Sequence, residues 1–136
     1  MLVSRRTLRS NNSWGHNSER LVSGKNRCTL QIHPDDATRV GVTTGQRVAL
    51  KSRVGEIVVP AEVTDSVMRG VVSLPHGWGH DREGVQMRVA SSKPGASVND
   101  VTDEAFVDAL SGTSSFSGVP VSVTALDAGP ATFART

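Results

Sequence analysis

A dense run of side-chain hydrogen-bond donors lies near the start of the 136-residue chain, at residues 5–17. Arginine can neutralise phosphate, asparagine and serine can bond the polar edges of a ring, and tryptophan and histidine can stack on a flat ring. The run therefore indicates a site for a nucleotide-like ligand, and a disordered, solvated arm is the alternative. Its candidate ligand-binding residues are Arg5, Arg9, Ser10, Asn11, Asn12, Ser13, Trp14, His16 and Asn17.

A second polar cluster follows the apolar strand expected at residues 71–74. Glycines on both sides of Trp78 let the backbone approach a ligand closely, and the indole offers a face for stacking. His76 and His80 add polar contacts at the end of a strand, a common place for a site. The candidate ligand-binding residues of this cluster are His76, Gly77 and Trp78.

Neither a metal site nor a catalytic residue is expected. His76 and His80 stand four apart, but two glycines between them disfavour a helix, and no third ligand lies at a zinc spacing. The sequence contains no Gly-x-Ser-x-Gly elbow and no Walker or Rossmann phosphate loop. Cys28 lies within an expected strand, where a buried, inert thiol is typical.

Composition and charge narrow the class of protein. The 15 basic and 13 acidic residues give a net charge of +2, too balanced for a nonspecific nucleic-acid binder. The positive charge gathers at residues 5–27, which suggests an anionic partner. A single cysteine forms no internal disulfide, and no apolar stretch has the length of a signal peptide or a membrane span. We therefore expect one cytoplasmic domain without a nucleic-acid or membrane partner.

Alternating apolar and polar residues predict a mainly β fold with a few short helices. Strands are expected at residues 28–32, 47–53, 56–63, 71–74 and 119–126. Short helices are expected at residues 33–40, where Pro34 suits the first turn and Gly41 the stop, and at residues 101–110. Residues 76–99 are expected to form a long loop. The predicted shared interior comprises Leu30, Ile32, Val48, Leu50, Ile57, Val59, Val63, Val72, Leu74, Val121 and Val123.

Four blocks of sequence stand in the order in which they occur in one family. They are residues 5–17, residues 30–63, Gly-Val-Val-Ser-Leu-Pro-His-Gly-Trp at residues 70–78, and Val-Asn-Asp-Val-Thr at residues 98–102. Together they resemble the C-terminal molybdopterin dinucleotide-binding domain of molybdopterin oxidoreductases, the group of formate dehydrogenases and nitrate reductases. The resemblance implies a six-stranded double-psi β-barrel that binds molybdopterin guanine dinucleotide through loops at one end.

The resemblance also implies how the chain is divided into segments and adds two residues to the expected site. It implies a cofactor-contact arm at residues 1–27, a barrel at residues 28–126 and a tail at residues 127–136. Asn99 and Asp100 join the cofactor-contact residues, although Val101 replaces the leucine usual in that block. Without its parent the arm is expected to be poorly ordered, because a polar, basic run gains little burial to offset the entropy of fixing its backbone.

Enzymes of this family are several times longer, and their metal and iron–sulfur ligands lie upstream. The chain is therefore interpreted as a module of a larger molybdenum or tungsten oxidoreductase, inactive alone, whose remaining domains are its partners. A stand-alone relative without the catalytic portion is one alternative. Another is a protein-interaction double-psi barrel like those of some AAA ATPases, which would not need the polar clusters. A self-processing barrel resembling aspartate decarboxylase is disfavoured, because the sequence has no Gly-Ser step.

Overall fold

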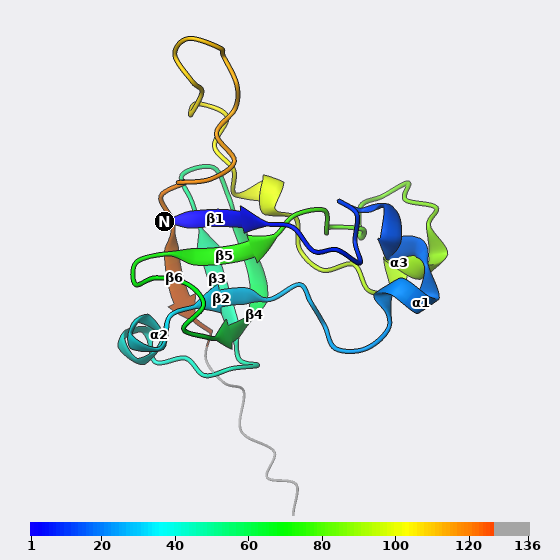
Figure 1. The fold of residues 1–136 in the computed structure, drawn as a ribbon, viewed down its shortest axis with the longest axis horizontal. Helices are drawn as coiled ribbons and strands as arrows, with labels where there is room; N and C mark the ends of the chain where they lie inside the picture. The colour runs from blue at the N-terminus through cyan, green and yellow to red at the C-terminus, as the bar shows by residue number, and fades with distance from the viewer. Residues whose placement is uncertain (127–136) are drawn as a thin grey trace, which may run out of the picture.

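Six short strands and a few short helices form the molecule in the computed structural model, which describes residues 1–126 (Figure 1). The strands are β1 (Leu2–Arg5), β2 (Leu30–Ile32), β3 (Arg47–Lys51), β4 (Glu56–Val63), β5 (Val72–Pro75) and β6 (Ser122–Ala125). The helices are α1 (Glu19–Val22), α2 (Pro34–Val40) and α3 (Arg88–Ser92), with 3-10 turns η1 (Trp14–Asn17) and η2 (Val98–Asp100). The expected mainly β fold with six strands is confirmed, and the tail at residues 127–136 lies outside the described residues.

The strands form one mixed sheet in the order β1-β5-β2-β4-β3-β6. The pairs β1–β5 and β2–β4 are parallel, whereas the other neighbours are antiparallel. Between the edge strands β1 and β6, the described residues contain no ladder that closes the sheet. The edges approach through one isolated bridge, in which Leu2 pairs with Val119 just before β6.

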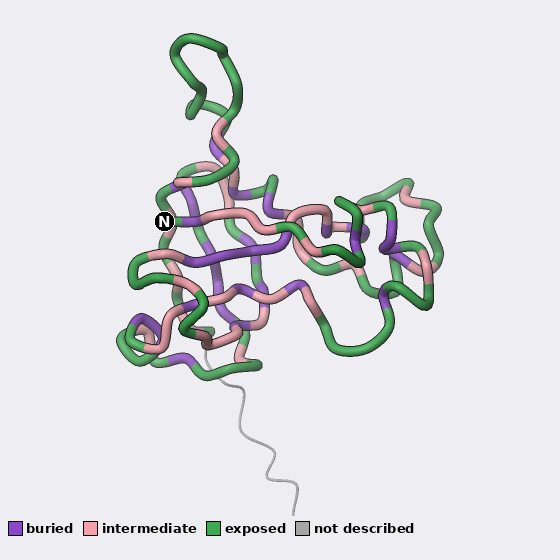
Figure 2. The backbone as a smooth tube through the Cα atoms, viewed as in Figure 1, coloured by how far each residue is buried: buried purple, intermediate pink, exposed green. Residues whose placement is uncertain are grey.

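The strands enclose the apolar core, as the alternation predicted. Buried residues are most frequent on β2, β3 and β5, and they alternate with exposed ones at the start of β4 (Figure 2). Eight of the predicted interior residues are buried in a single cluster, and Val63, Val121 and Val123 are partly buried and pack against it. The predicted interior is therefore confirmed. The cluster also contains residues that the alternation did not identify, chiefly Leu2, Val98, Val101 and Val119.

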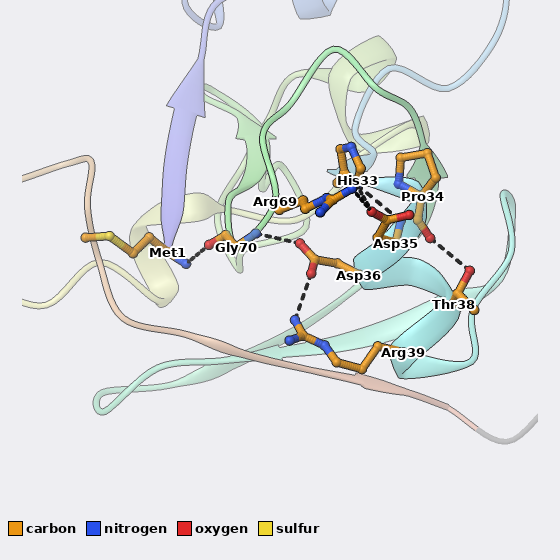
Figure 3. A network of polar contacts seen from close by, with 9 residues as sticks. All are labelled: Met1, His33, Pro34, Asp35, Asp36, Thr38, Arg39, Arg69 and Gly70. Atoms are coloured by element: carbon orange, nitrogen blue, oxygen red, sulfur yellow. Dashed lines mark hydrogen bonds and ion pairs between the residues drawn. The ribbon is translucent and has the colours of Figure 1, made fainter.

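Helix α2 begins at Pro34 and ends before Gly41, the two residues that predicted its start and its stop. His33 Nδ1 accepts a hydrogen bond from the Asp35 amide at 3.1 Å, Pro34 occupies the first turn, and Gly41 ends the helix with a left-handed φ of 78°. Asp36 ties the helix to the rest of the fold, because its Oδ2 accepts a hydrogen bond from the Gly70 amide at 2.6 Å just before β5 (Figure 3). The predicted short helix is confirmed.

The prediction of a helix at residues 101–110 is wrong. This segment instead leads into a loop that projects from the sheet, with one bridge between Val107 and Ser114 (Figure 1). Asp103 is buried and accepts hydrogen bonds from Arg53 Nε and Nη2, each at 2.6 Å, and from the Ala105 amide at 2.9 Å. A carboxylate that bonds the backbone two residues ahead competes with a helix.

The arm at residues 1–27 differs from the poorly ordered segment expected from its polarity. Leu2 is buried and pairs with Val72, so the arm begins as strand β1. The arm continues through η1 and α1, which contact each other, and η1 also contacts α3 in the expected long loop. A small apolar cluster of Val22, Cys28 and Trp78 lies beneath them. Contacts with distant segments therefore give the arm the burial that its own sequence lacks.

Replacement of Leu50 by Ala tests the register of the core. Leu50 is fully buried on β3, so Leu50→Ala should lower the free energy of unfolding by about 2–5 kcal/mol through lost burial and an unfilled cavity. Chemical denaturation measures the change. The matched control is Val58→Ala, whose side chain on the paired strand β4 is exposed and should contribute about 1 kcal/mol or less. Equal losses in the two variants would contradict the assigned register.

The Arg53–Asp103 pair predicts a pH dependence of stability. Hydrogen bonds from Arg53 hold the pKa of the Asp103 carboxyl below its usual range. A carboxyl whose pKa falls on folding stabilises the protein fully above its unfolded pKa of about 3.9, and this contribution is lost as the pH falls through the lower folded pKa. Urea denaturation should therefore show wild type more stable than Asp103→Asn at neutral pH, with the gap narrowing below about pH 4.

The control for this experiment is Asp65→Asn, which removes an exposed carboxylate that has no ion pair among the described residues. The free energy of unfolding of Asp65→Asn should match that of wild type across the same pH range. A gap between wild type and Asp103→Asn that stays constant down to acid pH would contradict the assignment.

Candidate functional site

The fold brings the two polar clusters into contact. The His16 ring of η1 stacks on the Trp78 indole in the loop after β5, with ring centroids 3.9 Å apart and planes inclined by 27°. His16 Nδ1 also lies 2.7 Å from His80 Nε2, although the residues are 64 positions apart. The arm and the His-Gly-Trp loop therefore form one structural unit, as a shared site requires.

Close backbone approach explains the glycines beside Trp78. Gly77 has a left-handed φ of 98°, and a Cβ there would lie 2.0 Å from the Asn12 carbonyl oxygen. A Cβ on Gly79 would lie 2.7 Å from Ser97 Cβ. The sequence predicted close approach to a ligand, whereas in the structure these glycines let the loop approach the arm and the segment before η2.

The histidine pair is buried and shares one hydrogen bond. One ring nitrogen must donate and the other accept, so the accepting imidazole is neutral. Burial lowers the pKa of His16, and the neighbouring His80 lowers it further. Burial also lowers the pKa of His80, against the opposing charge of Asp81. Burial therefore disfavours the charged form of both rings.

Two buried ring nitrogens of this unit lack a hydrogen-bond partner among the described residues. They are His16 Nε2 and Trp78 Nε1. A cavity of about 10 Å³ adjoins both rings and is also lined by Arg9, Ser10 and Arg27. Because buried polar atoms are rarely left unsatisfied, these nitrogens fit a polar ligand group or a water at this position.

Several predicted site residues bond to the protein itself. The Arg5 guanidinium donates to the Ser73 carbonyl at 2.5 Å and the Thr29 carbonyl at 2.8 Å, and burial lowers its pKa. Ser10 is buried and its hydroxyl donates to the Thr7 carbonyl at 2.9 Å. Asn17 Oδ1 accepts hydrogen bonds from two amides of α3. These residues hold the arm in place.

Other predicted site residues face outwards. Trp14 is 83% exposed, which is unusual for an indole and leaves its ring free to stack. Arg9 is exposed as well, and so are Asn11 and Asn12, whose left-handed φ values of 42° and 64° form a turn before η1. Ser13, His76 and Gly77 are partly buried at the same junction. These residues are the predicted ones most accessible to a ligand.

Asn99 and Asp100 lie on η2 and do not join this contact directly. Asp100 pairs with Arg82, and Asn99 is exposed. The segment before η2 does reach the loop, because the Pro94 carbonyl accepts hydrogen bonds from the amides of Gly79 at 2.8 Å and His80 at 3.2 Å. These contacts come from the segment just before the fourth sequence block, and Asn99 makes no hydrogen bond with the arm among the described residues.

Three cations that the site prediction missed lie beside a second cavity next to Trp78. Lys25, Arg27 and Lys93 line a cavity of about 320 Å³ together with Trp78. Lys25 and Arg27 stood out in the sequence only as part of the basic stretch at residues 5–27, and Lys93 stood in the expected long loop. Contact between segments so far apart has no local sequence signal.

Two other kinds of feature are not found within residues 1–126. No group of three or more histidine, cysteine, aspartate or glutamate side chains is placed to hold a metal ion there. In the same range, no helix has the length and apolar character needed to cross a membrane.

Comparison with known proteins gives several partial relatives. The chain is 36% identical over 58 residues to F420-dependent formate dehydrogenase 1 subunit alpha of Methanococcus maripaludis, covering 43% of this chain and 9% of that protein. It is 42% identical over 62 residues to biotin sulfoxide reductase of Cereibacter sphaeroides, covering 44% and 8%. The chain thus spans less than a tenth of the length of these two relatives.

A solved structure has the same fold. Acetylene hydratase from Pelobacter acetylenicus superposes with a TM-score of 0.75 and 18% sequence identity, covering 92% of this chain and 18% of the other. At this identity the likeness shows the fold alone.

The family comparison covers most of the chain. Residues 1–120 match the family described as Molydopterin dinucleotide binding domain, and this range includes both polar clusters and η2. The resemblance inferred from the four sequence blocks is therefore confirmed, and so is the expected cofactor class. The chain belongs to the family of molybdopterin dinucleotide-binding domains found in molybdopterin oxidoreductases.

Proposed function

We propose that this chain is a cofactor-holding module that binds molybdopterin guanine dinucleotide within a larger molybdenum or tungsten oxidoreductase, such as a formate dehydrogenase or nitrate reductase. The module has no catalytic residue of its own. The observation that carries the proposal is the contact between arm and loop through His16 and Trp78, because it joins the two polar clusters into one unit inside the family match.

The residues that would hold the cofactor are the accessible ones of this unit. Arg9 supplies a positive charge for a phosphate, Asn12 supplies hydrogen bonds to a polar ring edge, and Trp14 supplies a face for stacking. When bound, the cofactor supplies the metal at which substrate is oxidised or reduced. Asn11, Ser13, His76 and Gly77 at the junction and Asn99 and Asp100 on η2 complete the proposed contact set. The other predicted residues position the arm, namely Arg5, Ser10, His16, Asn17 and Trp78.

The buried stack makes this binding surface rigid in advance. His16 and Trp78 fix η1 against the loop, and Asn17 fixes η1 against α3. A surface that is ordered before the ligand arrives loses less conformational entropy on binding. This preorganisation supports a role in holding a ligand.

Closure of the sheet into a double-psi β-barrel is part of the proposal. The bridge from Leu2 to Val119 joins the two edges of the sheet, and both residues are buried in the same core. This pairing supports a barrel in which β1 completes the wall.

The remaining domains of the oxidoreductase are the proposed partners. In support, the projecting loop exposes Phe106, Val107, Leu110 and Phe116, and Leu110 is 99% exposed. The relatives are also far longer than this chain. Exposed apolar side chains gathered on one projection are typical of a contact surface. We assign the protein to the cytoplasm, which the lone, buried thiol of Cys28 supports.

Substitution of Arg9 and Asn99 tests cofactor binding. In the oxidoreductase that carries this domain, Arg9→Ala and Asn99→Ala should each weaken cofactor retention about tenfold or more, because each removes hydrogen bonds to a charged or polar ligand. The measurement is bound molybdopterin and molybdenum or tungsten per folded protein, with circular dichroism as the check on folding. Arg47→Ala, which removes an exposed arginine on β3, is the control and should retain cofactor. Full cofactor content in both folded test variants would refute the site.

Substitution of Gly77 tests the preorganised junction. Gly77→Ala places a Cβ against the Asn12 carbonyl and should separate the arm from the loop, which exposes Trp78. In a Trp14→Phe background only Trp78 remains, so its emission should shift to the red and become easier to quench. Gly84→Ala is the matched control, since Gly84 has a similar φ of 86° and open space around it. Its emission should match the parent; an identical response of the two variants would contradict the junction.

A further inference from the structure

The buried His16–His80 pair joins two segments that lie far apart in the sequence. His16 belongs to η1 in the arm, and His80 belongs to the loop after β5. Their facing nitrogens, His16 Nδ1 and His80 Nε2, lie 2.7 Å apart, and the two residues are 3% and 7% exposed. An imidazole is the side chain whose charge changes most readily near neutral pH. The contact between arm and loop therefore includes two groups that acid can alter.

The pair can bind only a limited number of protons without losing its bond. A contact of 2.7 Å between ring nitrogens holds one hydrogen, which one ring donates and the other accepts. One added proton leaves a neutral ring that still accepts. When both rings are protonated, both facing nitrogens carry a hydrogen and no acceptor is left. The bond is then lost, and two like charges face each other in a buried position.

The surroundings of each ring act on its charge in opposite directions. Burial lowers the pKa of His16, the neighbouring His80 lowers it further, and the Gly77 carbonyl opposes the shift. Burial lowers the pKa of His80 as well, and the carboxylate of Asp81 opposes it. The stack on Trp78 tolerates a charged His16 ring, since an aromatic face attracts a cation. The effect of acid is therefore exerted through the hydrogen bond between the histidines.

Positive side chains outnumber unpaired carboxylates around the pair within residues 1–126. Glu19 of α1 and Arg88 of α3 pair with each other. The other charged or titratable groups nearby are Arg9 and Arg27 of the arm, which line a small cavity with His16, Lys93 after α3, and His76 and Asp81 of the loop. A positive charge on both rings thus meets little compensation.

The direction of the pH effect follows from the lowered pKa values. A histidine whose pKa is lower when the arm and loop are in contact binds a proton more readily once they separate. The pair therefore stabilises the contact fully above the ordinary histidine pKa of about 6.5. This contribution is lost as the pH falls below that value.

We propose that the His16–His80 pair is an acid-sensitive latch, which holds η1 against the loop after β5 at neutral pH and releases it when both rings are protonated. The release is local, because β1 keeps its ladder to β5 and Asn17 keeps its bonds to α3. The surface proposed above to hold the cofactor then loses its preorganisation. That consequence rests on the proposed function, whereas the latch itself rests on the two rings.

Titration of the 136-residue chain from about pH 8 to about pH 5 tests the latch. In a Trp14→Phe background only Trp78 emits, so acid should shift its emission to the red and raise its quenching constant with acrylamide, with a midpoint below about pH 6.5. Both readouts report exposure of the indole, whereas emission intensity also responds to a charged imidazole beside it. Far-ultraviolet circular dichroism should stay constant over the same range, because the sheet and helices keep their bonds.

His80→Gln is the test variant, because a glutamine amide donates, accepts and does not titrate, so it can bond His16 in either protonation state. The acid transition should be lost in this variant. The matched control is His33→Gln, whose ring lies at the start of α2, and it should keep the transition. His16→Gln repeats the test from the other ring if His80→Gln does not fold.

Several outcomes would overturn the latch. They are an unchanged transition in His80→Gln, no transition in the parent, and a loss of circular dichroism that accompanies the transition. Loss of the transition in His33→Gln would do the same, since it would assign the titration to another part of the fold. The titration contains no cofactor, so its result is independent of cofactor retention in Arg9→Ala and Asn99→Ala, which tests the proposed function.

Discussion

The parallel pairing of β1 with β5 is the constraint on which the site depends. In its register Arg5 lies opposite Pro75, so the two strands leave the sheet at the same end. The arm after β1 and the His-Gly-Trp loop after β5 therefore start side by side. The Arg5 guanidinium strengthens this arrangement because it reaches the backbone of Ser73 on β5 and of Thr29 beside β2. The ring stack and the glycine contact both follow from this shared exit.

Elements stabilised by near neighbours could be predicted from the sequence. The β3–β4 hairpin and α2 have local signals in their alternation, their proline and their glycine, and the structure contains both. Elements that depend on distant partners could not be predicted from the sequence. Strand β1 has a short apolar stretch and exists because Leu2 meets Val72, and the expected helix at residues 101–110 fails because Asp103 bonds Arg53, fifty residues before it.

The candidate site could be predicted in its residue types but only partly in their roles. The polar arm and the His-Gly-Trp loop could be identified as candidate site segments because their polar residues are rarely buried in an apolar core. Nothing in the local sequence shows that Trp78 and His16 stack on each other, or that Trp14, two residues before His16, stays exposed. The basic cavity escaped prediction because Lys93 reaches the carbonyl of Val22 only in the folded chain.

The position of Leu2 has a consequence for how the chain folds. Its backbone pairs with Val72 of β5 on one side and with Val119 on the other, so both of its partners lie at least seventy residues later in the sequence. Contacts of such sequence separation are slow to form, since long loops must close before any burial repays them. The β3–β4 hairpin and α2 depend on near neighbours and can form early. The arm depends on distant partners, so we expect it to fold among the last segments. The ligand-binding surface is therefore assembled only after the rest of the sheet exists.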